Sequence, residues 1–291
     1  MYELIQVSEK CYYIDCPAKI GIIKLSDDEV YLIDSGNNKD AGKKVRRILD
    51  ENGWKLKAIL NTHSHADHIG GNKYLQEQTG CKIYAPSIET CFTNHPFLES
   101  ALLFGAMPPK DLQCKFMLAD QSQCETLSEG ILPTEIEIVS LPGHCLNMVG
   151  YKCDDVFFLA DCLSSKETLE KYQIGYIYDI DTYIETLELV KTMSPKVFVP
   201  SHASPCNEIS ELADYNIHKV SEIANKICDF CQKPLHFEEL LQKLFEEYNL
   251  EMNFVQYALV GSTVRSYLTY LKTKGRIDSF FENNILFWKT F

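Results

Sequence analysis

The sequence has no long apolar run and fewer basic than acidic residues. No stretch approaches the ~20 consecutive apolar residues that a transmembrane helix needs. No basic segment followed by an apolar one opens the chain, so no secretory signal is visible. We therefore expect a cytoplasmic protein with no membrane partner. Lys and Arg total 28 against 41 Asp and Glu, and the net charge of -13 disfavours a nucleic-acid partner, although a local basic patch could still bind one.

Cysteine is abundant, but it forms no repeating framework. Twelve cysteines are scattered along the 291 residues. In a chain of this size without a secretory signal, this pattern is typical of reduced thiols in a cytosol. Cys228 and Cys231 form a lone C-x-x-C pair within a helical pattern, with no second pair to complete a metal site. We interpret them as ordinary helix cysteines.

Up to about residue 205, short apolar runs alternate with turns and helical segments, which is typical of an α/β fold. The expected strands are 12–14, 20–25, 30–34, 57–61, 81–85, 135–139, 156–159 and 196–199. The expected helices are 40–51, 72–78 and 182–193, the last opened by a capping box at Thr182. Residues 86–130 form an insertion, helical at 97–104, that could cover a site. Its apolar segment 97–107 fits a substrate pocket and core packing equally well.

After about residue 210 the pattern changes to helices with apolar residues three and four apart, followed by a hairpin of 277–281 and 285–288. Helices followed by a hairpin resemble a small winged-helix domain. We therefore expect two domains, a catalytic one at 1–209 and a winged-helix-like one at 210–291. The tail could also pack beside the active site or form a homodimer contact.

The segment 261–276 would be the recognition helix of such a tail. It contains no acidic residue and four basic ones, namely Arg265, Lys272, Lys274 and Arg276. This composition is compatible with a nucleic-acid contact. However, three of the four lie in or just past the last helical turn, where the helix dipole favours cations. We prefer that second interpretation.

Histidine is scarce, yet three of the eight histidines lie within six residues. This cluster contains four potential metal ligands, His63, His65, Asp67 and His68, directly after a predicted strand. Imidazole with carboxylate suits Zn²⁺, Fe or Mn better than Ca²⁺ or Mg²⁺. His144, Asp161 and His202 each follow a later predicted strand, and loops at strand ends of an α/β scaffold usually converge. His95, His218 and His236 have no ligand spacing around them.

The motifs along residues 1 to about 205 resemble the metallo-β-lactamase superfamily, in its glyoxalase II-like hydrolase branch. The match consists of H-x-H-x-D-H at 63–68, Gly-His at 143–144, Ala-Asp at 160–161 and Ser-His at 201–202. Asp34, at the end of an early predicted strand, also matches. The resemblance implies a four-layer αββα sandwich with a dinuclear metal site in the groove between its sheets.

The resemblance also implies a role for each ligand. His63, His65 and His144 would bind the first metal, Asp67, His68 and His202 the second, and Asp161 would bridge both. Asp67 would also act in catalysis, by orienting a metal-bridging hydroxide and moving its proton. Asp34 would accept a hydrogen bond from a ligand imidazole. We expect a packed aromatic loop at Tyr172, Tyr176 and Tyr178, rather than a tyrosine that donates a hydrogen bond to a substrate oxyanion.

The expected function is therefore metal-dependent hydrolysis of a small thioester, ester or lactone. Two divalent ions would serve as cofactors, with zinc as first choice and iron or manganese as alternatives. Two other functions fit the same ligands. The first is a nuclease or phosphodiesterase that acts on RNA or DNA, and the second is a sulfur dioxygenase with a single iron.

Overall fold

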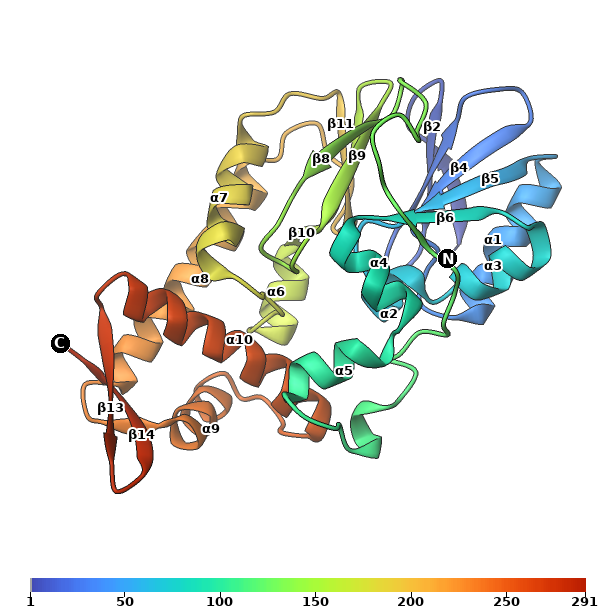
Figure 1. The fold of residues 1–291 in the computed structure, drawn as a ribbon. Coiled ribbons are helices and arrows are strands. Elements are labelled where there is room, and N and C mark those ends of the chain that lie inside the picture. The colour runs from blue at the N-terminus through green and yellow to red at the C-terminus, as the bar shows by residue number, and fades with distance from the viewer. Residues whose placement is uncertain (1) are drawn as a thin grey trace.

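In the computed structural model, two β-sheets pack against each other and helices cover their outer faces (Figure 1). The structure describes residues 2–291, so the first residue of the predicted catalytic domain lies outside the described residues. The larger sheet has seven strands in sequential order. These are β1 (Glu3–Gln6), β2 (Cys11–Asp15), β3 (Ile20–Lys24), β4 (Glu29–Ile33), β5 (Lys55–Leu60), β6 (Lys82–Ala85) and β7 (Glu125–Thr126).

The smaller sheet has four strands in the order β11-β10-β9-β8. They are β8 (Glu137–Ser140), β9 (Val149–Cys153), β10 (Val156–Ser164) and β11 (Val197–His202). β8, β9 and β10 pair antiparallel, whereas β11 pairs parallel to β10. In the larger sheet, β4, β5, β6 and β7 are also parallel, so their carboxyl ends lie along one edge.

Three apolar layers hold the sandwich together. Side chains such as Tyr151 and Phe158 fill the space between the sheets. Helices α1 (Lys39–Glu51) and α3 (Asn72–Thr79) cover the larger sheet, and α7 (Ile180–Lys191) and α8 (Ser210–Phe230) cover the smaller one. This arrangement confirms the predicted four-layer αββα fold.

Several element boundaries differ from those predicted. The predicted capping box at Thr182 is wrong, because Asp179 caps α7 by accepting hydrogen bonds from the backbone N–H groups of Asp181 and Thr182. β1 and β9 were not predicted. Helices α2 (Ala66–Ile69) and α6 (Lys166–Tyr172) were not predicted as separate elements either, because each is too short to show a clear period.

The insertion after β6 contains α4 (Ser87–Asn94), α5 (Phe97–Phe104) and the 3-10 turn Lys110–Leu112. The predicted helix at 97–104 is therefore confirmed. Leu103 is buried in a small apolar cluster with Ala258 of the tail, whereas Leu102 on the same helix stays exposed. The apolar segment thus contributes both core packing and an exposed surface.

The tail continues from α8 into β12 (Leu235–His236), α9 (Phe237–Glu247) and α10 (Phe254–Thr273), followed by the predicted hairpin of β13 (Ile277–Glu282) and β14 (Ile285–Thr290). One apolar cluster runs from β10 and α7 into α9 and α10. The tail therefore shares a core with the smaller sheet. The boundary at 209 and the winged-helix likeness stay predictions. Within residues 2–291, none of the helices has the length and apolar content to cross a bilayer.

Candidate metal centre

The histidine cluster begins in the loop that follows β5 with His63 and His65, and its other two members, Asp67 and His68, lie in α2. His144 lies in the loop between β8 and β9. Asp161 and His202 differ from the prediction, because Asp161 lies inside β10 and His202 is the last residue of β11 rather than following it. The parallel pairing of these two strands continues past Ala160 through a register shift, and Ala160 has a φ of 52°. This irregularity marks the point where the Asp161 carboxylate enters the site.

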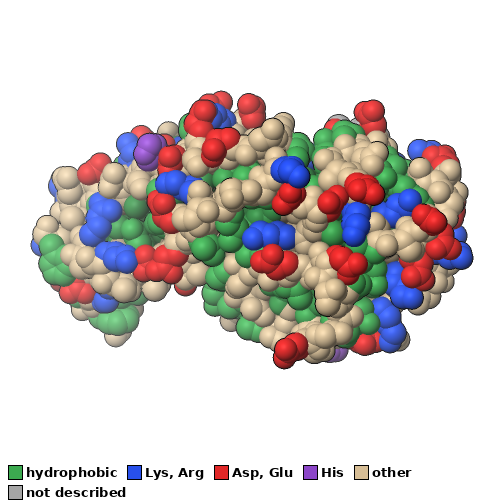
Figure 2. Space-filling model, turned by 90° about the horizontal axis from the view of Figure 1, so that it is seen from above, with side chains coloured by type: hydrophobic (Ala, Val, Ile, Leu, Met, Phe, Trp, Pro, Cys, Tyr) green, Lys and Arg blue, Asp and Glu red, His purple; other side chains and the backbone are tan. Residues whose placement is uncertain are grey.

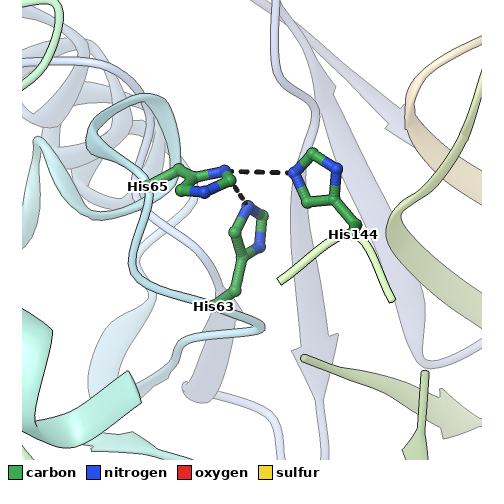
Figure 3. A group of neighbouring side chains, drawn as sticks. All are labelled: His63, His65 and His144. Atoms are coloured by element: carbon green, nitrogen blue, oxygen red, sulfur yellow. Dashed lines mark hydrogen bonds between the residues drawn. The ribbon is translucent and has the colours of Figure 1, made fainter. Parts of the chain in front are cut away.

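The structure brings all seven predicted ligands together in two groups. The first contains His63, His65 and His144, and the second contains Asp67, His68, Asp161 and His202. Within each group, one potential ligand atom per residue lies within 4.8 Å of every other. Figure 3 shows the imidazoles of the first group converging from two separate loops. Nδ1 of His65 lies 3.0 Å from Nε2 of His63 and 3.1 Å from Nε2 of His144.

Each of the five histidines has its second ring nitrogen close to a residue outside these groups. The pairs are His63 with Thr62 Oγ1 (2.9 Å), His65 with Glu99 Oε1 (3.5 Å), His68 with Asp34 Oδ2 (2.8 Å), His144 with the carbonyl of Tyr176 (3.0 Å), and His202 with the carbonyl of Pro17 (3.0 Å). Such partners fix the ring orientation and the tautomer of a metal ligand. The nitrogen left on each ring is the one that faces its own group.

The second group contains polar atoms that need a partner. Nε2 of His68 and Oδ1 of Asp161 lie 3.1 Å apart, yet both are buried without a well-aligned hydrogen bond within residues 2–291. A buried polar atom without a partner costs about 1–3 kcal/mol, and more when it is charged. A divalent cation between these atoms would satisfy both, so the residues fit a metal.

Asp161 is positioned to face both groups. Its Oδ1 lies 3.1 Å from Nε2 of His68, and its Oδ2 lies 3.1 Å from Nε2 of His202. The same Oδ2 lies 3.6 Å from Nε2 of His144 in the first group. This is the location that the predicted bridging role requires, and the role itself stays a prediction.

Asp34 lies behind the histidines rather than among the ligands. It is 1% exposed, with a φ of 63° directly after β4. Its carboxylate accepts hydrogen bonds from His68 Nδ1 and from the backbone N–H and the hydroxyl of Thr62, each at 2.8 Å. Asp34 therefore contacts one ligand of the second group directly and reaches His63 of the first group through Thr62.

The two groups differ in how readily their histidines are protonated. Burial and the neighbouring imidazoles hold the pKa of His63 well below its usual value and lower the pKa of His144 to about 3. These rings are neutral at pH 7, as a metal ligand must be. In the second group burial opposes protonation, but Asp161 and Asp67 outweigh it and raise the pKa of His202 to about 10. The carboxylates of Asp67 and Asp161 therefore attract positive charge, as a cation site requires.

Gly143 shapes the loop of His144. Its φ is 115°, and a Cβ at this position would lie 2.4 Å from Cα of Tyr183 in α7. Only glycine fits this position without strain. The Gly143 carbonyl also accepts hydrogen bonds from the backbone N–H groups of Tyr178 and Asp179. The loop before α7 is thereby fixed against the loop that carries His144.

The sequence did not single out Thr62, Glu89 or Glu99, all of which lie near the first group. Glu99 belongs to α5 and faces His65 beside a cavity of about 10 Å³ lined by Leu102 and Tyr176. Tyr176 packs edge-on against His65 and His144, whereas Tyr172 and Tyr178 are exposed. The carboxylates come from an insertion without a strand-end pattern, so no local signal marked them. His95, His218 and His236 lie outside both groups, and His236 caps α9.

Comparison with known proteins places these motifs in a family. A family model described as the metallo-β-lactamase superfamily matches residues 13–202, more than half of the chain. A hydroxyacylglutathione hydrolase from Nitrobacter hamburgensis is 33% identical over 123 residues, which cover 42% of this chain and 39% of that protein. One from Klebsiella pneumoniae is 29% identical over 152 residues, 50% of this chain and 51% of that protein. The chain thus spans about half or less of the length of these relatives.

Solved structures share the fold over nearly the whole chain. A β-lactamase domain protein from Burkholderia ambifaria has a TM-score of 0.71 at 16% identity, covering 99% of this chain and 94% of its own. A metallo-β-lactamase family protein from Thermus thermophilus has a TM-score of 0.73 at 18% identity, covering 96% and 98%. The predicted fold is therefore confirmed. The sandwich, the two ligand groups at its edge and the family match together show that the chain belongs to the metallo-β-lactamase superfamily.

Proposed function

We propose that this protein is a dinuclear metal hydrolase that cleaves a small thioester, ester or lactone. The observation that supports it best is the pair of donor groups that Asp161 faces, with buried atoms of His68 and Asp161 that lack partners within residues 2–291. Three nitrogen donors and a separate group of four donors favour two metals over a single iron. Zinc is our first choice, because it accepts imidazole and carboxylate ligands in this number.

Two divalent ions in these groups would lower the pKa of a bound water and polarise a carbonyl oxygen of the substrate. The residues of the chain then have distinct tasks. Asp161 would hold both groups in register, and Asp34 would keep the His68 ring oriented. Asp67 has a side chain that is 41% exposed, and its Oδ2 lies 3.4 Å from His202 Nε2. It could therefore hold a proton at Oδ2 and pass it to solvent or to a leaving group.

The four basic residues of segment 261–276 are engaged within the molecule. Arg265 lies 3.8 Å from the ring centroid of Phe237, and Lys272 forms an ion pair with Asp278 at 3.0 Å. Lys274 pairs with Asp181 of α7 at 2.8 Å, and Arg276 donates to Asn225 of α8 at 2.8 Å. These contacts disfavour both a nucleic-acid surface and a binding site for the carboxylates of glutathione.

The charge on the rest of the molecule also disfavours an anionic ligand. Figure 2 shows Lys and Arg side chains scattered among Asp and Glu side chains on the face seen from above. With a net charge of -13, the protein repels polyanions at long range. We therefore infer a substrate with few negative charges, and a cytoplasmic location that keeps the twelve cysteines reduced.

A substrate panel tests this function. The metal-loaded protein would be assayed against uncharged thioesters and lactones, a glutathione thioester, a phosphodiester and a short RNA. We expect the uncharged thioesters or lactones to have a kcat/KM at least about tenfold above that of the glutathione thioester, because the acidic protein repels the anionic substrate. A tenfold difference requires only about 1.36 kcal/mol of such repulsion in the transition state. Cleavage of the RNA or phosphodiester above all carbonyl substrates would overturn the proposal.

A further inference from the structure

Glu89 is a buried acid outside the two ligand groups. It lies in the first turn of α4, in the insertion, and is only 2% exposed. Its Oε2 accepts hydrogen bonds from the backbone N–H of Ser64 at 3.0 Å and from the Ser64 hydroxyl at 2.7 Å. Its Oε1 accepts one from the backbone N–H of Asn147 at 3.0 Å. Carboxylates are rarely buried this deeply unless they are paired, and here three hydrogen bonds take the place of a charged partner. The position of Glu89 therefore suggests a role for these hydrogen bonds.

The two partners of Glu89 belong to the two loops that carry the first ligand group. Ser64 lies between His63 and His65, in the loop after β5 of the larger sheet. Asn147 lies three residues after His144, in the loop between β8 and β9 of the smaller sheet. The carboxylate therefore joins loops from opposite sheets at the place where the three imidazoles meet.

Backbone hydrogen bonding between these two loops does not by itself fix the positions of the histidines. Val149 N–H donates to the carbonyl of Thr62 at 3.1 Å, which fixes the strand ends but not the tips. The tips carry the histidines, and His65 and His144 approach each other only through their side chains, at 3.1 Å. A rigid bridge at Ser64 and Asn147 would hold this spacing before any metal binds.

We propose that Glu89 is a positioning residue that sets the distance between the two histidine loops and so determines the affinity of the first metal group. Its hydrogen bonds go to Ser64 and Asn147, so it would act mainly through the backbone of these two residues. The inference rests on the proposed metal centre. Loss of such an outer partner typically lowers metal affinity about 10- to 100-fold.

The test is Glu89→Gln, measured as zinc affinity by competition with a chelator. The amide keeps the size of the side chain, but its NH₂ group must face either the Ser64 donors or the Asn147 N–H. We expect affinity in the first group to fall about 10- to 100-fold. To titrate that group alone, the comparison would be repeated in a His202→Ala background. Glu77→Gln, an exposed position on the neighbouring helix α3, is the matched control and should change nothing.

Ser64→Ala gives a second, milder variant that keeps the backbone hydrogen bond and removes only the hydroxyl. It should lower first-group affinity by less than Glu89→Gln, and it decides the question if Glu89→Gln fails to fold. Unchanged metal affinity in a folded Glu89→Gln protein would overturn the role of Glu89. If Glu89→Gln does not fold, unchanged metal affinity in Ser64→Ala would overturn it instead. Failure of the unmodified protein to bind zinc, iron or manganese would instead overturn the proposed metal centre, so the two failures are distinguishable.

Discussion

Asp161→Asn is expected to lower the turnover number by about 1,000-fold or more. Oδ1 of this carboxylate faces His68, and Oδ2 faces both His202 and His144. Asparagine retains a single neutral oxygen, so the charge that holds two cations together disappears. Because metal stabilisation of a developing oxyanion is worth several kcal/mol, and each 1.36 kcal/mol is tenfold in rate, the loss of one metal accounts for this magnitude.

The variant would be compared with Asp27→Asn, which changes an exposed aspartate before β4, at the end of that strand opposite Asp34. Both proteins should give the same circular dichroism spectrum. Only Asp161→Asn should lose bound metal on dialysis. A folded Asp161→Asn protein with full turnover would contradict the bridging role.

Asp67→Asn is expected to lower the turnover number by about 100- to 10,000-fold, as loss of a general acid or base does. Asp67 has the most exposed side chain of its group, at 41%, so it is the donor that water and a leaving group can reach. Asparagine could still offer an oxygen to a metal, but it cannot hold the proton. The first group contains no atom of Asp67, so its metal should remain.

Steady-state kinetics with metal analysis on the same sample would check this result. The expected signature is a large fall in kcat with at least one metal per chain retained. Equal loss of both metals would instead assign Asp67 a purely structural role, and unchanged kcat would remove it from the chemistry. Asp27→Asn again serves as the control.

That the seven side chains of the two groups lie together was predictable because it follows local rules. The H-x-H-x-D-H segment after a strand gives a dense local signal, and α/β strands place their following loops at one edge. Asp161 was placed past the end of its strand, whereas β10 continues through it. That continuation depends on parallel pairing with β11, which begins more than thirty residues later in the chain. Sequence periodicity within one segment contains no information about such pairing.

Glu89 and the basic residues of the tail show the same limit. Nothing in the sequence around Glu89 separates it from an exposed helix acid, because its burial depends on Ser64 and Asn147. Likewise the sequence left open a nucleic-acid contact at Lys274 and Arg276, because it does not show that Asp181 and Asn225 lie beside them. Long-range partners decide whether a charge is available to a ligand, and one segment does not reveal them.

The number of metal ions per chain tests the central claim most directly. Protein purified without oxygen would be analysed for zinc, iron and manganese, with hydrolysis of the best panel substrate measured on the same sample. The two donor groups predict two divalent ions per chain, with activity lost on chelation and restored only when both return. Full activity with one ion per chain, or with none, would contradict the dinuclear account.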